Sequence, residues 1–407
     1  MTERDCDDND DNDDSDDALE DAPLASAGTA FLLRRDIAFL NHGSFGACPR
    51  PVFAEYQRWQ HVLEEEPVEF LGRRLDALLA EARAPLGAFL GTASDNLVFV
   101  PNATFGMNVI AHSFPLEPGD EVLGTTHEYG AVERTWTFIC EAKGAQYRSQ
   151  PITLPVTSAE ALIEQLWQGV TPRTRALVIS HITSPTALIF PVAEICRRAA
   201  AQGIITVIDG AHAPGQIDLA LDEIGADLYT GNLHKWTCAP KGSAFLYARP
   251  DRQAMLQPLI VSWGWRAISP GPSPFQDYFG WTGTSDPAAY LSVPAAIAFQ
   301  RQNDWPGVRA KCHELVSVAS QRIGELTGLP PISPESPDWW GQMRAVPIPR
   351  TSASAQEIQQ RLWEDFQIEI PIIDWQDQRF VRISIQAYNR PRDVDRLVAA
   401  LREILSA

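Results

Sequence analysis

Two neighbouring stretches decide the fold of this chain: Ile205-Thr-Val-Ile-Asp209-Gly-Ala-His212 and Asp227-Leu-Tyr-Thr-Gly-Asn232-Leu-His234-Lys235. Each is an apolar run rich in β-branched residues that ends in polar side chains. Short apolar runs of this kind are typical of buried parallel strands, which carry functional groups at their carboxyl ends. The pair therefore predicts one α/β unit with an aspartate and a lysine at the ends of its strands.

Asp209 and Lys235 supply a particular pair of chemical functions. A lysine can form a Schiff base with an aldehyde, and an aspartate can keep a pyridinium nitrogen protonated; pyridoxal phosphate needs both from its protein. The alternative is that Asp209 caps a helix and that Lys235 lies at the surface. Lys235 stands between two apolar runs. Because burial of an unpaired ammonium is costly, this position favours a functional lysine.

The rest of the chain predicts an α/β architecture with two lobes. Strand-like and helical runs alternate between residues 96 and 247, and the helical run 191–203 ends in glycine. This alternation predicts a mostly parallel sheet covered by helices. Residues 250–290, rich in Trp, Gly and Pro, are interpreted as a long ordered loop, and residues 307–405 as a smaller α+β lobe. The predicted strands of the sheet are Leu97–Val100, Glu121–Gly124, Ala176–Ser180, Ile205–Asp209, Asp227–Tyr229 and Ser243–Tyr247.

Charge and composition argue against several other classes of protein. With 407 residues and 45% hydrophobic content, the chain can bury a large core. Residues 1–21 carry twelve acids against Arg4, hence −11 of the net charge of −19, so we expect this run to be disordered. We find no basic surface suited to nucleic acid, no secretory signal and no membrane-spanning run. The six cysteines lack metal-binding spacing and are expected to be free thiols in a cytoplasmic protein.

Eight motifs follow one another in the order of a known family. The motifs are Phe39-Leu-Asn-His-Gly-Ser-Phe-Gly46, Asn102-Ala-Thr-Phe-Gly-Met-Asn108, His127-Glu-Tyr-Gly-Ala131, Ser180-His-Ile-Thr-Ser-Pro185, Asp209-Gly-Ala-His212, His234-Lys235, Gly283-Thr284 and Arg382-Ile-Ser384. On these motifs, residues 30–405 resemble the fold-type I pyridoxal-phosphate enzymes of the class V aminotransferase group, and within it the isopenicillin N epimerase-like branch.

The resemblance implies a fold, a domain division and an assembly. We expect a large domain with a mostly parallel seven-stranded sheet between helices, and a smaller α+β carboxyl-terminal domain. The expected divisions are a disordered acidic tail over 1–29, the N-terminal segment and large cofactor-binding domain over 30–290, and the small domain over 291–407, with part of the N-terminal segment packing near it. The resemblance also implies pyridoxal 5'-phosphate as cofactor, no metal, and a homodimer with shared active sites.

The cofactor's phosphate requires hydrogen-bond donors. Ala103, Thr104 and Phe105 follow a predicted strand and begin a helix, which offers free N–H groups and the positive end of the helix dipole. The resemblance adds the side chains of Asn232 and His234. It also implies that Thr284 reaches the phosphate of the partner subunit.

The resemblance assigns roles around the cofactor's ring as well. Tyr129 is expected to stack on the ring, where desulfurases carry a histidine; a plain core tyrosine is the alternative. His212 is expected near the edge of the ring, and Ser184 is expected to hydrogen-bond the phenolic oxygen. Together with Lys235 and Asp209, Tyr129 completes the expected catalytic set.

A substrate carboxylate requires a guanidinium group, which can bind it through two hydrogen bonds. Arg382 matches the carboxylate-binding arginine of the family; a surface arginine on an edge strand is the alternative. In the N-terminal segment, which is expected to close over the substrate, Asn41, His42 and Ser44 are candidate substrate contacts.

The residues predict removal of the Cα proton of an amino acid by Lys235 but leave the fate of the carbanion open. Epimerisation is favoured by the resemblance, with Tyr129 or His42 as the second acid. The alternatives are β-elimination with carbon–sulfur cleavage, transamination, and a silent binding scaffold. Desulfuration is disfavoured because no cysteine, its required nucleophile, follows Cys312.

Overall fold

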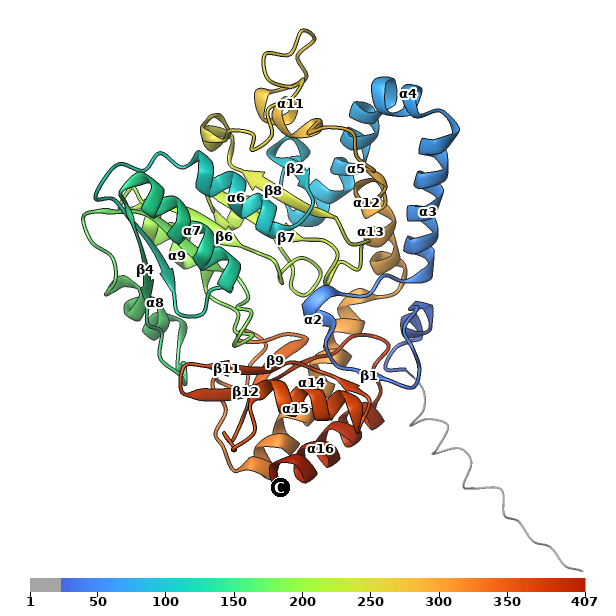
Figure 1. Cartoon of the computed structure of the whole chain (residues 1–407), viewed down its shortest axis with the longest axis vertical. Helices are drawn as coiled ribbons and strands as arrows, with labels where there is room; N and C mark the ends of the chain where they lie inside the picture. Colours follow the sequence, from blue (N-terminus) through green and yellow to red (C-terminus); the bar gives the residue numbers. More distant parts are fainter. Residues whose placement is uncertain (1–22, 407) are drawn as a thin grey trace, which may run out of the picture.

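The computed structural model describes residues 23–406, which form two lobes (Figure 1). The larger lobe is built on a seven-stranded sheet in which β8 alone runs antiparallel to its neighbours. This confirms the predicted mostly parallel sheet. The strands, in spatial order, are β2 (Leu97–Val100), β8 (Ala244–Ala248), β7 (Leu228–Asn232), β6 (Ile205–Asp209), β5 (Thr174–Ser180), β3 (Glu121–Thr125) and β4 (Gln146–Gln150).

Both faces of this sheet are buried. Along β5, Ala176 and Val178 pack into one apolar cluster and Leu177 and Ile179 into another, because successive side chains point to opposite faces. Such two-sided burial requires uninterrupted apolar strands, as the sequence shows. The helices between the strands are α6 (Ala103–Ser113), α7 (Gly130–Lys143), α8 (Ala159–Trp167), α9 (Val192–Ala200) and α10 (Leu221–Ile224).

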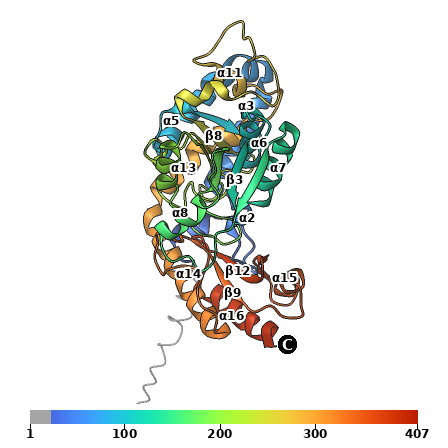
Figure 2. The ribbon, with the colours of Figure 1, turned by 90° about the vertical axis from the view of Figure 1, so that its left-hand side faces the viewer.

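Helices from the beginning and the end of the large lobe's sequence pack together along one side of the lobe (Figures 1 and 2). The antiparallel α3 and α5 pack against α12 and α13, and the long α14 then leads into the smaller lobe. Their bounds are α2 (His42–Phe45), α3 (Arg50–Glu65), α4 (Pro67–Glu69), η2 (Phe70–Arg74), α5 (Leu75–Leu90), η3 (Ser94–Asn96), α12 (Ala288–Leu291), α13 (Val293–Gln302) and α14 (Trp305–Thr327).

The smaller lobe has an antiparallel sheet in the order β11-β12-β9, packed against helices. The N-terminal segment joins this lobe: β1 pairs with β10, and the Ser384 N–H donates to Leu40 O at 2.9 Å. The segment then enters the boundary between the lobes as α2. The elements are β1 (Ala38–Phe39), β9 (Met343–Ile348), α15 (Ala355–Glu364), β10 (Ile368–Glu369), β11 (Ile372–Trp375), β12 (Gln378–Ser384) and α16 (Pro391–Ser406).

Three segments differ from the sequence prediction. The edge strand β4 was not among the predicted strands because its residues, Gln146–Gln150, are mostly polar. The segment 250–290, predicted to be a loop, contains the 3-10 helix η4 (Pro250–Met255) and α11 (Pro274–Gly280), which Ser273 caps. The predicted disordered tail extended too far, since η1 (Ser26–Ala30) is folded and Ala27 is buried. The acidic run over 1–21 lies outside the described residues.

The loop between η4 and α11 projects from the large lobe (Figure 1). It exposes apolar side chains, with Trp263 at 79% and Ile268 at 95% of their full exposure. Within residues 23–406, no helix is long and apolar enough to cross a membrane.

Candidate active site

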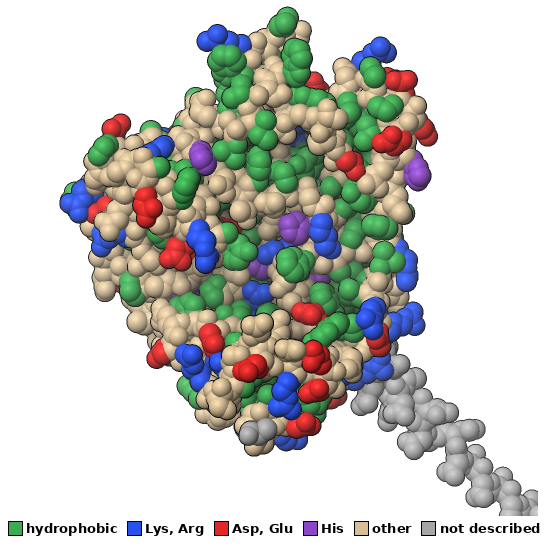
Figure 3. Space-filling model, in the orientation of Figure 1, with side chains coloured by type: hydrophobic (Ala, Val, Ile, Leu, Met, Phe, Trp, Pro, Cys, Tyr) green, Lys and Arg blue, Asp and Glu red, His purple; other side chains and the backbone are tan. Residues whose placement is uncertain are grey.

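Functional side chains converge where three parallel strands end. Ser180, Asp209 and Asn232 are the last residues of β5, β6 and β7, and Ser180 pairs with Asp209 in the ladder. His234 and Lys235 follow directly after β7. Because parallel strands end at one edge of the sheet, these groups share one site facing the smaller lobe. Figure 3 shows histidine and basic side chains gathered in the hollow at the centre of this face.

Lys235 loses its proton far more easily than an ordinary lysine. Its Nζ lies 3.1 Å from His212 Nε2, while the Trp236 indole Nε1 donates to His212 Nδ1 at 3.4 Å. Since Nδ1 accepts, the proton of His212 resides on Nε2, which donates to the amine. Burial, followed by the charge of Arg382, lowers the pKa of Lys235 to about 7. A neutral amine is the form that attacks an aldehyde.

Asp209 is a buried carboxylate without a cationic contact. It is 5% exposed and accepts a 2.9 Å hydrogen bond from the Ala211 N–H. Burial raises its pKa, and the charge of Lys235 only partly opposes this. No ion pair joins it to any residue within 23–406. A cation placed against Asp209 would therefore be stabilised strongly.

Glu128 is a second buried carboxylate, which the sequence analysis did not select. It accepts hydrogen bonds from the Ser180 N–H at 2.8 Å, the Ser180 hydroxyl at 2.6 Å and Thr125 Oγ1 at 2.7 Å. Burial raises its pKa to about 7, with a smaller contribution from Asp209. These bonds fix the turn before α7, so that Tyr129, 49% exposed, stands at the rim of the site.

The helix terminus predicted to bind phosphate is partly occupied by the protein itself. The Ala103 N–H donates to Asn232 Oδ1 at 2.9 Å, and the Phe105 N–H to Asn102 Oδ1 at 2.8 Å. These two N–H groups are therefore not free, contrary to the sequence prediction. The N–H and hydroxyl of Thr104 have no partner within residues 23–406, and neither does the amide nitrogen of Asn232.

His234 lies at the same end as a neutral imidazole. Its Nδ1 is 3.3 Å from Ser243 O, and burial lowers its pKa to about 4. With Nδ1 donating to the carbonyl, Nε2 becomes a donor only when the ring takes up a proton. An anion bound here would favour that proton uptake.

Arg382 presents an unpaired charge to the site. Its guanidinium donates to Ser184 O at 2.7 Å, Ser184 Oγ at 3.1 Å and Ser44 Oγ at 3.2 Å, while Nε has no partner. No carboxylate among residues 23–406 contacts it. Burial lowers its pKa to about 10. Ser184 contacts this guanidinium, and its predicted contact with a phenolic oxygen stays a prediction.

His42 and Asn41 make hydrogen bonds within the protein, and their predicted contact with substrate stays a prediction. His42 is fully buried; its Nε2 donates to Lys235 O at 3.0 Å and its Nδ1 accepts from the Tyr388 hydroxyl at 2.9 Å. Burial lowers its pKa to about 3, which argues against the predicted role as second acid. Asn41 bonds to Glu369 and to Ser44, which in turn contacts Arg382.

Thr284 lies apart from these contacts in an exposed segment before α12. It has no hydrogen-bond partner among residues 23–406. Its predicted role requires a second copy of the chain and stays a prediction.

Comparisons with known proteins agree with this architecture. The family model described as aminotransferase class-V matches residues 52–397. An isopenicillin N epimerase of Amycolatopsis lactamdurans is 35% identical over 90% of this chain and 94% of its own length. A putative L-cysteine desulfhydrase 1 of Oryza sativa subsp. japonica is 31% identical over 91% and 83%. This chain therefore belongs to the class V aminotransferase family.

Solved structures show the same fold. A cysteine desulfurase of Thermococcus onnurineus NA1 matches with a TM-score of 0.78 at 16% identity, over 93% of this chain and 97% of that chain. A mutant of C-DES with glycine covalently linked to its PLP cofactor matches with a TM-score of 0.77 at 21% identity, over 90% and 97%. At these identities the likeness concerns the fold.

Proposed function

We propose that this chain is a pyridoxal-phosphate-dependent enzyme that acts at the Cα of an amino acid. Among the possible reactions, we favour epimerisation. The observation that carries the proposal is that one site holds a lysine of lowered pKa, an unpaired carboxylate and an unpaired guanidinium. Each of the three lacks the partner that this cofactor and an amino-acid substrate would supply. A protein that only needed stability would not keep such buried charges unpaired.

The residues fit the cofactor at both of its ends. Asp209 would hold the ring nitrogen protonated, and Thr104, Asn232 and a protonated His234 would hold the phosphate. When bound, the cofactor would supply a sink for the electron pair of the Cα–H bond. His212 Nε2–H lies within hydrogen-bond distance of Lys235 Nζ. It could therefore also donate to an oxygen of a cofactor or substrate bound beside that amine.

The substrate's carboxylate is assigned to Arg382. Ser184 and Ser44 orient the guanidinium without neutralising it, so its charge remains available. Lys235, whose pKa of about 7 makes its neutral form available near pH 7, then takes the Cα proton. His42 holds the Lys235 carbonyl and thereby fixes the position of the base.

Epimerisation requires a second proton donor on the opposite face of Cα. Tyr129 is the candidate because it stands half-exposed at the rim and its phenol interacts with Arg382. The 35% identity with the Amycolatopsis epimerase supports this outcome.

Carbon–sulfur β-elimination is the second candidate. The support is the 31% identity with the rice desulfhydrase. Lyase chemistry shares the Lys235, Asp209 and Arg382 roles but needs a leaving group on Cβ and no second acid on the far face. The two outcomes therefore differ in their dependence on Tyr129. Two further alternatives are transamination and a protein without catalytic activity that uses the fold only for binding.

We also propose a homodimer in which Thr284 completes the partner's phosphate site. The exposed Trp263 and Ile268 support an interface on the projecting loop, since apolar side chains of this size are normally covered. A cytoplasmic location is proposed because the five described cysteines are all free thiols.

One experiment separates these functions. The full-length holoenzyme is incubated in deuterated water with L-amino acids and S-substituted cysteines, and α-deuteration, chirality, pyruvate and ammonia are followed together. Epimerisation gives deuterated product of inverted chirality without pyruvate, whereas elimination gives pyruvate and ammonia. Tyr129→Phe should abolish inversion but spare elimination. Absence of α-deuteration with every substrate would overturn the enzymatic proposal.

A further inference from the structure

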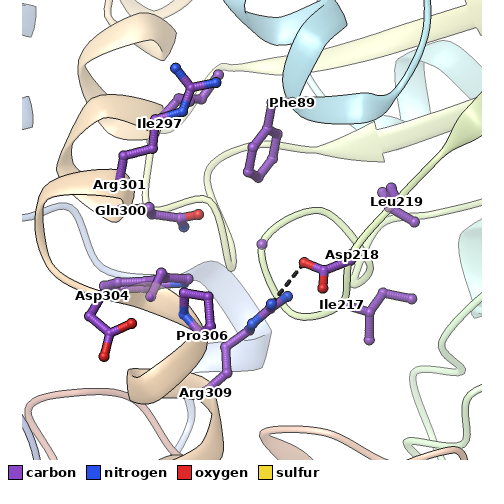
Figure 4. A pocket seen from close by; sticks show the side chains of 12 residues that line it. Phe89, Ile217, Asp218, Leu219, Ile297, Gln300, Arg301, Asp304, Pro306 and Arg309 are labelled. Carbon is purple, nitrogen blue, oxygen red and sulfur yellow. Dashed lines mark hydrogen bonds and ion pairs between the residues drawn. The ribbon is translucent and has the colours of Figure 1, made fainter.

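A separate cavity lies behind the lysine, between α5, α13, the start of α14 and the loop that follows β6 (Figure 4). Its volume is about 340 Å³, at the small end of the range of about 300–1,000 Å³ typical of ligand sites. None of the residues assigned above to cofactor or substrate lines it. The cavity is therefore distinct from the candidate active site.

The lining combines an apolar wall with balanced charge. Phe89, Ile217, Leu219 and Ile297 form the apolar part. The charged residues are two arginines and two aspartates, of which Arg309 is partly buried and Arg301, Asp218 and Asp304 are exposed to solvent. Figure 4 shows the Arg309–Asp218 pair, with 2.7 Å between its atoms, reaching across one side of the cavity. Because the charges cancel, the lining favours a neutral or zwitterionic ligand over a net ion.

Gln300 supplies an unsatisfied polar atom. Its side chain is 3% exposed, and its Nε2 donates to Trp236 O at 2.8 Å, which fixes the orientation of the amide. Gln300 Oε1 has no hydrogen-bond partner within residues 23–406, and Figure 4 shows the amide directed into the cavity. This oxygen is open to the cavity, so a donor on a ligand can reach it.

We propose that this cavity binds a small apolar α-amino acid as its zwitterion. The ammonium group satisfies Gln300 Oε1 and Asp218, the carboxylate binds the arginines, and the side chain packs against Phe89 and Ile217. Ion-paired groups of both signs beside an apolar wall match the three parts of such a molecule.

The cavity shares a wall with the segment of the catalytic lysine. Gly215, with φ +87°, lies so close to Trp236 that an added Cβ would be 2.4 Å from Trp236 O. Gln300 holds the same carbonyl. An occupant that draws on Gln300 therefore acts on the residue next to Lys235. This regulatory consequence rests on the proposed function, whereas binding itself does not.

The test measures binding of L-leucine and L-phenylalanine to the full-length Arg382→Met holoenzyme by calorimetry, because that variant cannot hold a carboxylate beside Lys235. We expect one saturable site per chain. Leu219→Trp, which fills the cavity from a half-buried position, and Gln300→Leu should each weaken binding at least tenfold. N-acetyl-leucine, which lacks the ammonium group, should bind at least tenfold more weakly than leucine.

Two results would overturn the proposal: no saturable binding to the Arg382→Met protein, or binding that Leu219→Trp leaves unchanged. The visible absorption band of the cofactor is recorded in the same samples. We expect leucine to shift the pH midpoint of this band, and a midpoint that does not move would refute the coupling to Lys235. If no band forms on addition of pyridoxal phosphate, the proposed function fails while the binding result still stands.

Discussion

Replacing Arg382 with methionine should abolish activity without unfolding the protein. Its guanidinium is 5% exposed, and burial lowers its pKa from the usual value of an arginine to about 10. At about 1.4 kcal/mol per pKa unit, the unpaired charge costs the folded state about 3 kcal/mol. For a base whose pKa is lower in the folded state, the cost is fully present below the folded pKa. It disappears only as the pH rises above about 10, so it applies in full at pH 7.

The substitution relieves this cost and loses the hydrogen bonds to Ser184 and Ser44, worth about 1 kcal/mol each. We therefore expect the free energy of unfolding to change by less than about 2 kcal/mol. The lost pairing with a substrate carboxylate is worth about 3–5 kcal/mol. This predicts a fall in kcat/KM of about a hundred-fold to several thousand-fold.

Arg379→Met is the matched control. This arginine lies on the same strand, is 3% exposed and pairs with Asp374 at 2.7 Å. Its loss should destabilise the protein by about 1–3 kcal/mol and leave kcat/KM unchanged. Urea unfolding and steady-state kinetics are measured for both variants. The reasoning fails if Arg382→Met keeps kcat/KM within threefold, or if it destabilises the protein by more than about 2 kcal/mol.

The remaining predictions concern the cofactor, the assembly and the tail. Lys235→Ala should lose covalent cofactor attachment, and borohydride reduction with peptide mapping should label Lys235; a label on Lys241 would contradict the assignment. Because the pKa of Lys235 is lowered to about 7, the rate of attachment to apoprotein should rise with pH up to about 7 and then level off, and a rise that continued to pH 10 would argue against a neutral lysine. Asp209→Asn should fold normally yet lose α-proton exchange, which a wild-type exchange rate would disprove. Thr284→Val should weaken cofactor retention, and mixing it with Lys235→Ala should restore one working site per heterodimer; a mixture without recovered activity would argue against shared sites. Deletion of residues 1–21 should leave kcat unchanged, and a large loss would show that the acidic run takes part in catalysis.

The sequence predicted secondary structure correctly where a segment had one clear pattern, such as an unbroken apolar run. Buried strands such as β5 and β6 are unbroken apolar runs, so their type and their carboxyl-terminal polar residues were predictable. The polar edge strand β4 was missed because its backbone pairing with β3 is a tertiary contact that leaves no apolar pattern. Helix α11 was missed because Gly and Pro around it are typical of loops, whereas packing against β2 and capping by Ser273 stabilise the helix.

The sequence by itself determined which residues carry the chemistry: Asp209, Lys235 and Arg382 stand in motifs whose residue types have few other uses together. Only the tertiary structure decided the burial, the hydrogen-bond partners and the protonation of these three side chains. It buried Arg382 without an acid and placed His212 against the lysine. It also gave His42, a predicted substrate contact, a hydrogen bond to the Lys235 carbonyl. Burial and hydrogen-bond pairing arise between segments far apart in the chain, and they set charge and availability, which no local pattern encodes.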